Sequence, residues 1–413
     1  MTTSDVEPDA PAVRPLRQLL SLVSFRRFLL AQTLSALVNG TLRFVLVWIT
    51  LDLTDWQPAV GLVGLALGVT GLLVAVPAGA WSDRLDRRTM FVRLSAVTAL
   101  VLASATAVVH TGTGGVALLA LHAAVLGGLL AAVAPGVQAM VPALVPSERL
   151  MNGVALQMMS MNVAMMLGAV FGGVAIAVAG NAGGLGLLTV CAAGAALSMH
   201  AVATPAHVPA PRTTRLGAEV MVGLRWSLGR EPVRSLLGIM LVIGFLWGGV
   251  QLLLPDLAKT ELGAGAFAAS ALFAPLGLGM ITTSLFLASR TSIRHRGRLL
   301  TAALIANLGP LVVVLAVSRS YVLTLVLMAI WGVGGGVVMT MQRTLLQERT
   351  PDELMGRVMG LNTLGILGSF PLAAAVAAAL TAVSDSTTAL VVMGITTTLA
   401  AAAITLRRPI RTA

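Results

Sequence analysis

The sequence predicts an all-α polytopic membrane protein, with twelve transmembrane helices in two pseudo-symmetric six-helix bundles. Three observations predict this fold class. The 413 residues are 57% hydrophobic and only 10% charged, with a mean hydropathy of +0.92, which is typical of a chain that crosses a bilayer many times. Apolar runs long enough to span a bilayer alternate with short polar turns. The second half of the chain also repeats short motifs of the first.

The apolar runs place the twelve helices near 27–51, 58–81, 89–110, 115–140, 150–179, 183–204, 234–257, 266–288, 299–318, 321–345, 354–381 and 387–406. They divide the chain into an N-terminal tail (1–26), an N-terminal six-helix bundle (27–204), a linker with an interfacial helix (205–233), a C-terminal six-helix bundle (234–406) and a C-terminal tail (407–413). We expect both tails and the linker to be cytoplasmic.

The basic residues set this orientation. Apart from Arg43, Lys259 and Arg319, the Lys and Arg residues fall on segments that lie on the same side as the two termini when the spans are even in number. Cytoplasmic segments of membrane proteins carry an excess of Lys and Arg. The sequence therefore predicts a multi-pass protein of a bacterial plasma membrane. The same distribution explains the net charge of +11 without a nucleic-acid partner.

The first span carries a polar stripe. Gln32, Asn39, Arg43 and Thr50 fall within roughly 40° of each other at about 100° per residue. A polar stripe on an apolar span must face protein or water rather than lipid. One interpretation is that Gln32, Asn39 and Arg43 line a central ligand-binding cavity. The alternative is that carbonyls and amides of neighbouring helices hold Arg43.

The turn between the second and third spans is rich in glycine and charge. It reads Gly79-Ala80-Trp81-Ser82-Asp83-Arg84-Leu85-Asp86-Arg87-Arg88. The Asp83 carboxylate lies at the C-terminal end of a helix, where it opposes the helix dipole and needs a positive partner. An arginine of the turn or the start of another helix would supply one.

This pattern, Gly-x-x-x-Asp-Arg-x-x-Arg-Arg, resembles the signature loop of the major facilitator superfamily of transporters. Asp86 stands where that family usually has glycine, which is similar to its drug-exporting branch of macrolide and siderophore exporters. The resemblance implies a conformational latch, formed by Gly79, Asp83, Arg84, Arg87 and Arg88 with the start of the eleventh span. The alternative is a solvated loop whose arginines only fix the orientation of the chain.

The fifth span combines methionines with closely spaced glycines. Met158 and Asn162 lie in its first half and are candidate cavity residues, because Met is adaptable and lines promiscuous apolar sites. A core or lipid-facing position is the alternative. The later Gly168-x-x-x-Gly172-Gly173 permits close helix contact. It resembles a motif of proton-coupled exporters in which a proline stands at the position of Ala169.

The second half repeats the first at an offset of about 205 residues. Pro146-Ser147-Glu148 corresponds to Pro351-Asp352-Glu353, and Gln138 corresponds to Gln342. Parallel six-helix repeats of this kind are typical of such transporters. Trp247 and Gln251, at i and i+4 of the seventh span, and Gln342 of the tenth are further candidates for cavity residues. Anchoring at the membrane interface is the alternative for the tryptophan.

Several chemistries have no sequence support. The chain lacks a phosphate-binding Gly-x-x-x-x-Gly-Lys-Ser/Thr loop and a His-Glu-x-x-His motif, and its five histidines and single Cys191 are scattered. We therefore expect no enzymatic activity, no cofactor and no metal site. A non-transporting membrane scaffold is a distant alternative. The polar first span argues against it, since polar residues in a span are costly and a passive framework does not need them.

The remaining energy source is an ion gradient. The resemblance implies a secondary transporter that works by alternating access and exports amphiphilic small molecules, such as drugs or secondary metabolites, by proton antiport. An importer or uniporter of a small solute is the alternative. Asp52 and Asp256, near the outer ends of their spans, are the candidate proton-coupling residues. The expected partners are the small-molecule substrate, protons and the lipid bilayer, and a monomer suffices for the fold.

Overall fold

The computed structural model describes residues 19–138, 140–203, 216–288 and 296–405. Within these ranges the regular secondary structure is all helical, and turns or irregular segments connect the helices. The helices of the first half are α2 (Val23–Leu53), α3 (Pro58–Arg84), α4 (Arg87–Thr111), α5 (Val116–Gln138), α6 (Val141–Leu144), η1 (Ser147–Arg149) and α7 (Leu150–His200). Those of the second half are α8 (Leu216–Leu228), α9 (Val233–Thr260), α10 (Ala266–Ala271), α11 (Phe273–Ala288), α12 (Arg296–Ala303), η2 (Leu304–Leu308), α13 (Gly309–Val317), α14 (Tyr321–Glu348), α15 (Asp352–Thr381) and α16 (Ser386–Thr405).

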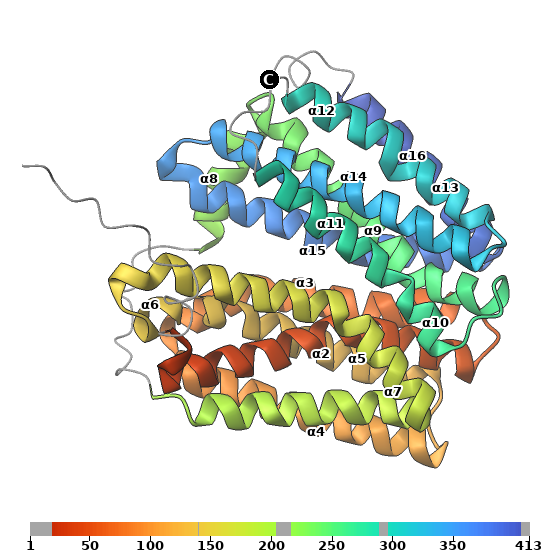
Figure 1. The fold of residues 1–413 in the computed structure, drawn as a ribbon, viewed down its shortest axis with the longest axis horizontal. Coiled ribbons are helices and arrows are strands. Elements are labelled where there is room, and N and C mark those ends of the chain that lie inside the picture. The colour runs from red at the N-terminus through yellow and green to blue at the C-terminus, as the bar shows by residue number, and fades with distance from the viewer. Residues whose placement is uncertain (1–18, 139, 204–215, 289–295, 406–413) are drawn as a thin grey trace, which may run out of the picture.

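Eleven helical segments of the described chain are long and apolar enough to cross a membrane, and one of them crosses twice. The 51 residues of α7 would reach about 76 Å if straight, more than twice the thickness of a hydrocarbon core. The chain turns back at Ala179 and Gly180, which have non-helical backbone angles. Gly180 has a φ of +69°, a conformation that glycine adopts without steric cost. The twelve predicted crossings are therefore present (Figure 1).

Two predicted spans are not single α-helices. The run 266–288 forms α10 and α11, with a break at Leu272. Pro275 has no N–H to donate to the carbonyl of residue 271, which explains why α10 stops there. The run 299–318 contains α12, the π-helical turn η2 and α13, whose second residue is Pro310. Apolar runs alone do not reveal such breaks.

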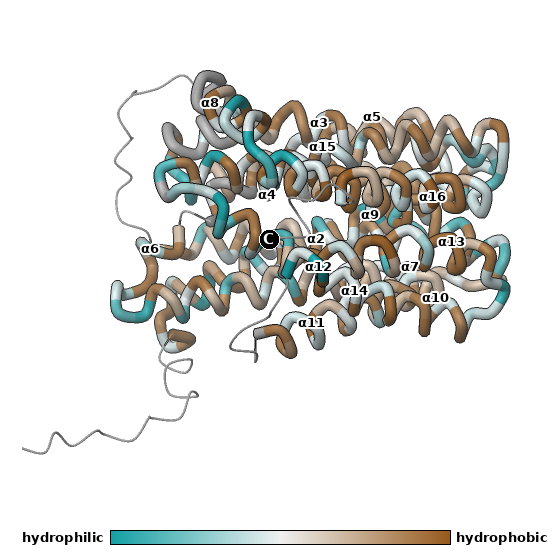
Figure 2. The backbone as a smooth tube through the Cα atoms, turned by 90° about the horizontal axis from the view of Figure 1, so that it is seen from above, coloured by the Kyte–Doolittle hydropathy of each residue, from teal (hydrophilic) through white to brown (hydrophobic). Residues whose placement is uncertain are grey.

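The two halves form separate bundles that meet at one end (Figure 1). Helices α2 to α7 make the first bundle and α9 to α16 the second, and their ribbons lie closest near α10 and separate toward α6 and α8. Asp52 and Lys259 form an ion pair between the bundles at the close end, which we call the joined end. Hydrophilic residues concentrate near the ends of the helices, and apolar residues cover their lengths (Figure 2).

Small residues allow the bundles to approach at the joined end. A Cβ on Gly61 of α3 would lie 2.6 Å from the Cβ of Ala378 of α15, and one on Gly173 of α7 would lie 2.5 Å from the Cβ of Ser270 of α10. Such distances require glycine, since real Cβ atoms do not come so close to other heavy atoms. We call the contact between α3 and α15 the glycine seam. It continues from Gly61 and Ala378 as far as Leu72 and Gly368, near the middle of the two helices.

Close packing within the first bundle fixes the depth of the polar first span. A Cβ on Gly168 of α7 would lie 2.7 Å from the carbonyl carbon of Gly40 of α2. The neighbouring Thr41 hydroxyl donates a hydrogen bond of 2.7 Å to the carbonyl oxygen of Gly168. The close contact expected of the Gly168 motif is therefore present. It sets Arg43 of α2 beside the methionines of α7.

Candidate functional site

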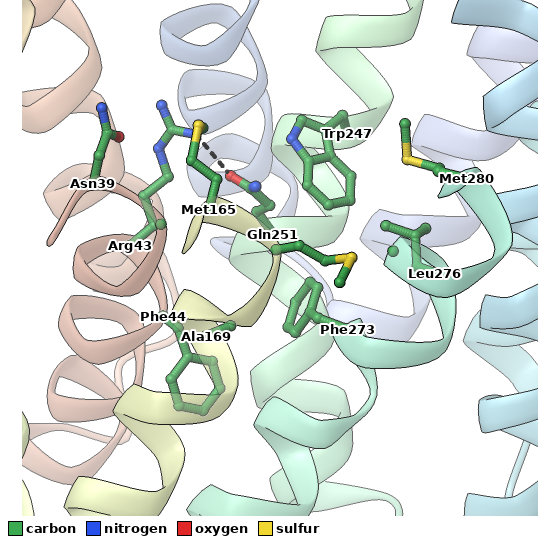
Figure 3. Close-up of a pocket in the computed structure, with 13 residues that line it drawn as sticks. Asn39, Arg43, Phe44, Met165, Ala169, Trp247, Gln251, Phe273, Leu276 and Met280 are labelled. Carbon is green, nitrogen blue, oxygen red and sulfur yellow. Dashed lines mark hydrogen bonds between the residues drawn. The ribbon is translucent and has the colours of Figure 1, made fainter. Parts of the chain in front are cut away.

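A cavity of about 190 Å³ lies between the two bundles (Figure 3). Two helices of each bundle contribute residues to its lining. The lining residues are Asn39, Gly40, Arg43 and Phe44 of α2, Met165, Met166 and Ala169 of α7, Trp247 and Gln251 of α9, and Phe273, Leu276, Gly277 and Met280 of α11. A cavity at the interface of two bundles changes shape whenever the bundles move relative to each other.

Arg43 is the one charged residue among those that line the cavity. Its Nη1 donates to Oε1 of Gln251 at 3.1 Å, which links α2 of the first bundle to α9 of the second. Its Cζ also lies 4.5 Å from the ring centroid of Phe370, within the range of a cation–π contact. Both contacts cross between the bundles, and both partners are neutral.

Trp247 and Phe273 form an aromatic wall opposite Arg43, and Phe44 adds a ring from the α2 side of the cavity. Trp247 makes an edge-on contact with Phe273, with centroids 6.4 Å apart and planes at 87°. Phe273 makes a similar contact with Phe44, at 6.5 Å and 78°. Edge-to-face packing at these separations is the favoured arrangement of aromatic pairs. The rings of both bundles therefore interlock around the cavity, and Met165, Met166 and Met280 complete an adaptable apolar surface.

A second layer supports this wall. The ring of Trp331 lies 5.8 Å from that of Trp247, and its Nε1 donates to the carbonyl oxygen of Leu308 at 3.2 Å. The neighbouring Asn307 donates from Nδ2 to the Trp331 carbonyl at 3.1 Å. Leu308 and Asn307 both belong to the π-helical turn η2. The irregular turn therefore positions Trp331, which in turn backs a cavity residue.

Four of the eight predicted cavity residues line this cavity: Asn39, Arg43, Trp247 and Gln251. Gln32 lies elsewhere, buried against α7, where Nε2 donates to the carbonyl oxygen of Gln157 at 3.3 Å. Gln342 is fully buried between helices of the second bundle, and its Nε2 donates to the carbonyl oxygen of Leu236 and to Oδ1 of Asn362, both at 3.0 Å.

Met158 and Asn162 of α7 are exposed and are not among the lining residues. Met165 and Met166, further along the same helix, line the cavity in their place. Sequence reasoning also missed Phe44, Phe273 and Met280. An aromatic or methionine residue within an apolar span gives no periodic signal that distinguishes a cavity face from a lipid face.

The predicted latch is only partly within the described residues. Gly79, Asp83 and Arg84 lie in the last turns of α3, but the side chains of Asp83 and Arg84 fall outside the described part of the structure. Arg87 begins α4. Arg88 donates to the carbonyl oxygens of Met199 and His200, at the end of α7 in its own bundle.

Asp86, which stands in the usual glycine position of the loop, caps the following helix. Its Oδ2 accepts a hydrogen bond of 2.8 Å from the backbone N–H of Thr89. Its φ is −60°, so this position has no left-handed backbone that would require glycine. Asp is a preferred N-cap residue, and its charge also suits the start of a helix.

The two predicted proton-coupling acids have different surroundings. Asp52 accepts from Lys259 Nζ and, at 2.9 Å, from Asn181 Nδ2. Asp256 is only 4% exposed and accepts from the Ser386 hydroxyl within the second bundle. Lys259 lies beyond the predicted end of the seventh span at 257, but α9 continues to Thr260 and includes it in its last turn, where its Nζ also donates to the Leu51 carbonyl at 3.0 Å.

Metal chemistry gains no support from the described residues. Nowhere in them do three or more His, Cys, Asp or Glu side chains come together as a metal site would require. Cys191 is buried.

Comparison with known proteins identifies a family over most of the chain and curated relatives over about half of it. The sequence model of the Major Facilitator Superfamily matches residues 28–374. The enterobactin exporter EntS of Shigella boydii serotype 18 is 29% identical over 235 residues, which is 54% of this chain and 52% of the relative. EntS of Escherichia coli O139:H28 gives the same identity and coverage. The chain thus spans about half the length of the curated relatives it matches.

Solved structures share the fold over nearly the whole chain. A bacterial homologue of the human lysosomal transporter Spinster, in an inward-facing conformation, has a TM-score of 0.72 at 14% identity and covers 98% of both chains. The peptide transporter PepTSo has a TM-score of 0.71 at 12% identity, covering 93% of this chain and 97% of its own. The nucleoside transporter NupG has a TM-score of 0.69 at 13% identity, covering 92% and 98%. At these identities the likeness shows the fold alone.

Proposed function

The chain belongs to the major facilitator superfamily and is a multi-pass membrane transporter, and we propose that it exports amphiphilic small molecules by proton antiport. The observation that carries the proposal is the cavity between the bundles, which takes its lining from α2 and α7 on one side and α9 and α11 on the other. A site shared by two bundles opens to alternate sides of the membrane when the bundles rock.

The lining supports an amphiphilic ligand. Phe44, Trp247 and Phe273 offer aromatic surface, and methionines of α7 and α11 adapt to different shapes. Arg43 and Gln251 supply the polar contacts on one side. Apolar pockets with a few placed polar groups are typical small-molecule sites, with the polar groups fixing the orientation of the ligand.

Export is favoured over uptake by two relatives that match about half of the chain, both of which are enterobactin exporters. We place the chain in a bacterial plasma membrane with both termini in the cytoplasm, following the distribution of Lys and Arg. The joined end then lies outside, and this conformation faces the cytoplasm. That is the side from which an exporter takes up its substrate.

Proton coupling is assigned to Asp52 and Asp256, the acids near the joined end of α2 and α9. Asp52 belongs to an ion pair between the bundles, so its protonation changes a contact that differs between conformations. We retain the proposed latch at Gly79, Asp83, Arg84, Arg87 and Arg88, at the other end of the bundles. An ion pair at each end, made and broken in turn, would stabilise the two conformations alternately.

The proposal is tested by accumulation of fluorescent amphiphiles in bacterial cells. The panel contains anionic, neutral and cationic dyes, and cells with the intact chain are compared with cells carrying an empty vector. The expected result is lower accumulation of at least one dye, reversed when an uncoupler collapses the proton gradient. Higher accumulation would instead indicate an importer. An equal level of every dye in both cell types would overturn export.

A further inference from the structure

We propose that the ligand of the interface cavity is an organic monoanion, with one acidic group joined to a flat aromatic body, and that Arg43 recognises the acidic group. This rests on the proposed function and names its substrate class. The juxtaposition that carries it is a cation and an aromatic wall that face each other across one cavity without an acid in the lining.

The charge of Arg43 has no counter-ion among the described residues. Its contacts there are the amide oxygen of Gln251 and the ring of Phe370, both neutral. Asp52 and Asp256, which lie in the outer parts of α2 and α9, are engaged elsewhere: Asp52 pairs with Lys259, and Asp256 accepts from Ser386. An unpaired guanidinium within a membrane protein is costly, and a bound anion would remove that cost.

The geometry of the guanidinium suits a carboxylate. Arginine carries five N–H donors in a planar fork, and the hydrogen bond to Gln251 uses one of them. A carboxylate accepts two parallel hydrogen bonds from such a fork, and charge-assisted pairs of this kind are the strong ones. With one cation in the lining, the site balances a single negative charge.

The opposite wall selects the rest of the molecule. Trp247 of α9 and Phe273 of α11 present their rings opposite Arg43, and the ring of Phe44 of α2 packs against that of Phe273. A flat aromatic body packs against such a set better than a flexible alkyl chain does, since ring–ring contacts add to simple burial. The cavity volume of about 190 Å³ lies below the roughly 300–1,000 Å³ of drug-sized pockets, so the body is small.

An anion at this position also lies beside a contact between the bundles. It would share the Arg43 fork with Oε1 of Gln251, which belongs to α9 of the second bundle. The ligand would therefore bind at a contact that joins the two bundles. A cationic ligand has no such access, because Arg43 repels it and no lining acid offsets the repulsion.

The test uses the purified full-length chain in lipid nanodiscs and three ligands that share one ring system: naphthoate, naphthylmethanol and naphthylmethylamine. Isothermal titration calorimetry measures each affinity. Naphthoate is expected to bind at least about tenfold more tightly than the neutral alcohol, and the amine to bind least. Arg43→Gln should remove the preference for the acid and leave the affinity for the alcohol within about twofold.

Two further variants keep the test decisive. Gln251→Glu places a carboxylate beside Arg43 and should weaken naphthoate binding about tenfold even if Arg43→Gln does not fold. Arg319→Gln makes the same change at an arginine whose partner is Glu261, away from the cavity, and should leave all three affinities unchanged. Tighter binding of the amine, or an unchanged preference for the acid in Arg43→Gln and Gln251→Glu, would overturn the proposal. Export of cationic dyes alone from cells would overturn it as well, while leaving export itself intact.

Discussion

Asp52, at the end of α2, and Lys259, in the last turn of α9, pair across the interface of the two bundles. Lys259 also donates to the Leu51 carbonyl at 3.0 Å, and Asn181 of α7 donates to the other oxygen of Asp52 at 2.9 Å. About a third of each charged side chain is exposed. An ion pair this exposed contributes about 1 kcal/mol or less, so it biases the conformational equilibrium without locking it.

Breaking this pair should open the joined end more often. We expect Asp52→Asn or Lys259→Gln to raise the labelling of a cysteine introduced at Ala169 in the cavity, by up to about fivefold, since the pair contributes about 1 kcal/mol at most. A membrane-impermeant maleimide applied from the outer side measures this in a Cys191→Ser background. Glu261→Gln breaks an ion pair with Arg319 inside the second bundle and is the matched control. Failure of the exchanged pair, Asp52→Lys with Lys259→Asp, to restore low labelling would contradict the assignment.

The close packing of α3 against α15 at the glycine seam predicts that a larger side chain there separates the bundles. A Cβ at Gly61 would meet the Ala378 backbone nitrogen at 2.6 Å and the Ala374 carbonyl oxygen at 2.7 Å, and backbone atoms cannot rotate away as side chains do. We therefore expect Gly61→Val to push the bundles apart at the joined end. Spin labels at the exposed positions Trp56 and Val383 should then show a longer distance by pulsed electron paramagnetic resonance.

The control is Gly360 of α15, the helix that packs against Gly61 of α3. A Cβ at Gly360 would have no heavy atom within 4 Å, so Gly360→Val should leave the distance between the labels unchanged. An equal lengthening in both variants would mean that valine perturbs the helices in general. Such a result would contradict a role specific to the contact of Gly61 with Ala378.

Much of the fold follows from the sequence because bilayer thickness and helix rise fix the length of a span. The reversal at Gly180 lies between two predicted runs for this reason. Asn39 and Arg43 of the predicted stripe of α2 line the cavity, since a polar residue on an apolar helix avoids lipid. The same rule does not distinguish a cavity from a hydrogen bond between helices, and therefore Gln32 and Gln342 were placed in the cavity although they lie elsewhere.

Contacts between residues far apart in the chain are the features of the fold and the site that could not be predicted from the sequence. The partner of Asp52 is 207 residues away, and nothing in either local sequence links the two residues. Phe44 and Phe273 likewise meet only because α2 and α11 lie on opposite sides of one cavity. Asn307 of the π-helical turn η2 bonds to the Trp331 carbonyl of α14. Helix propensity and hydrophobic periodicity do not predict such a contact between helices.

Gln342 should stabilise the second bundle rather than act on substrate. Its amide joins α14 to the Leu236 carbonyl of α9 and to Asn362 of α15. Replacement by leucine keeps most of the volume and removes both hydrogen bonds, which average about 0.6 kcal/mol each between membrane helices. We expect Gln342→Leu to lower the thermal unfolding midpoint of the purified protein. Thr363→Val, on an exposed residue of α15 whose hydroxyl bonds within its own helix, should leave the midpoint unchanged. A larger loss of transport than of stability would contradict this structural role.

Asp256 is the acid whose neutralisation should uncouple transport. It is nearly fully buried, accepts a hydrogen bond from Ser386 of α16, and has Lys259, Glu261 and Asp385 as the charged groups around it. Asparagine keeps the shape and the acceptor oxygen but cannot carry a proton. We therefore expect Asp256→Asn to retain substrate binding and to lose transport driven by an imposed pH gradient in proteoliposomes.

Asp385→Asn is the matched control for this variant, because that carboxylate is exposed and accepts from the backbone N–H of Thr388. It removes a neighbouring negative charge without touching the buried acid, so gradient-driven transport should persist. If Asp256→Asn also transports uphill, Asp256 is not the carrier. Asp52 is then the next carrier to test, since it is the other acid near the joined end and its pair with Lys259 links the two bundles. Loss of gradient-driven transport in Asp52→Asn, with substrate binding retained, would assign the proton to that carboxylate.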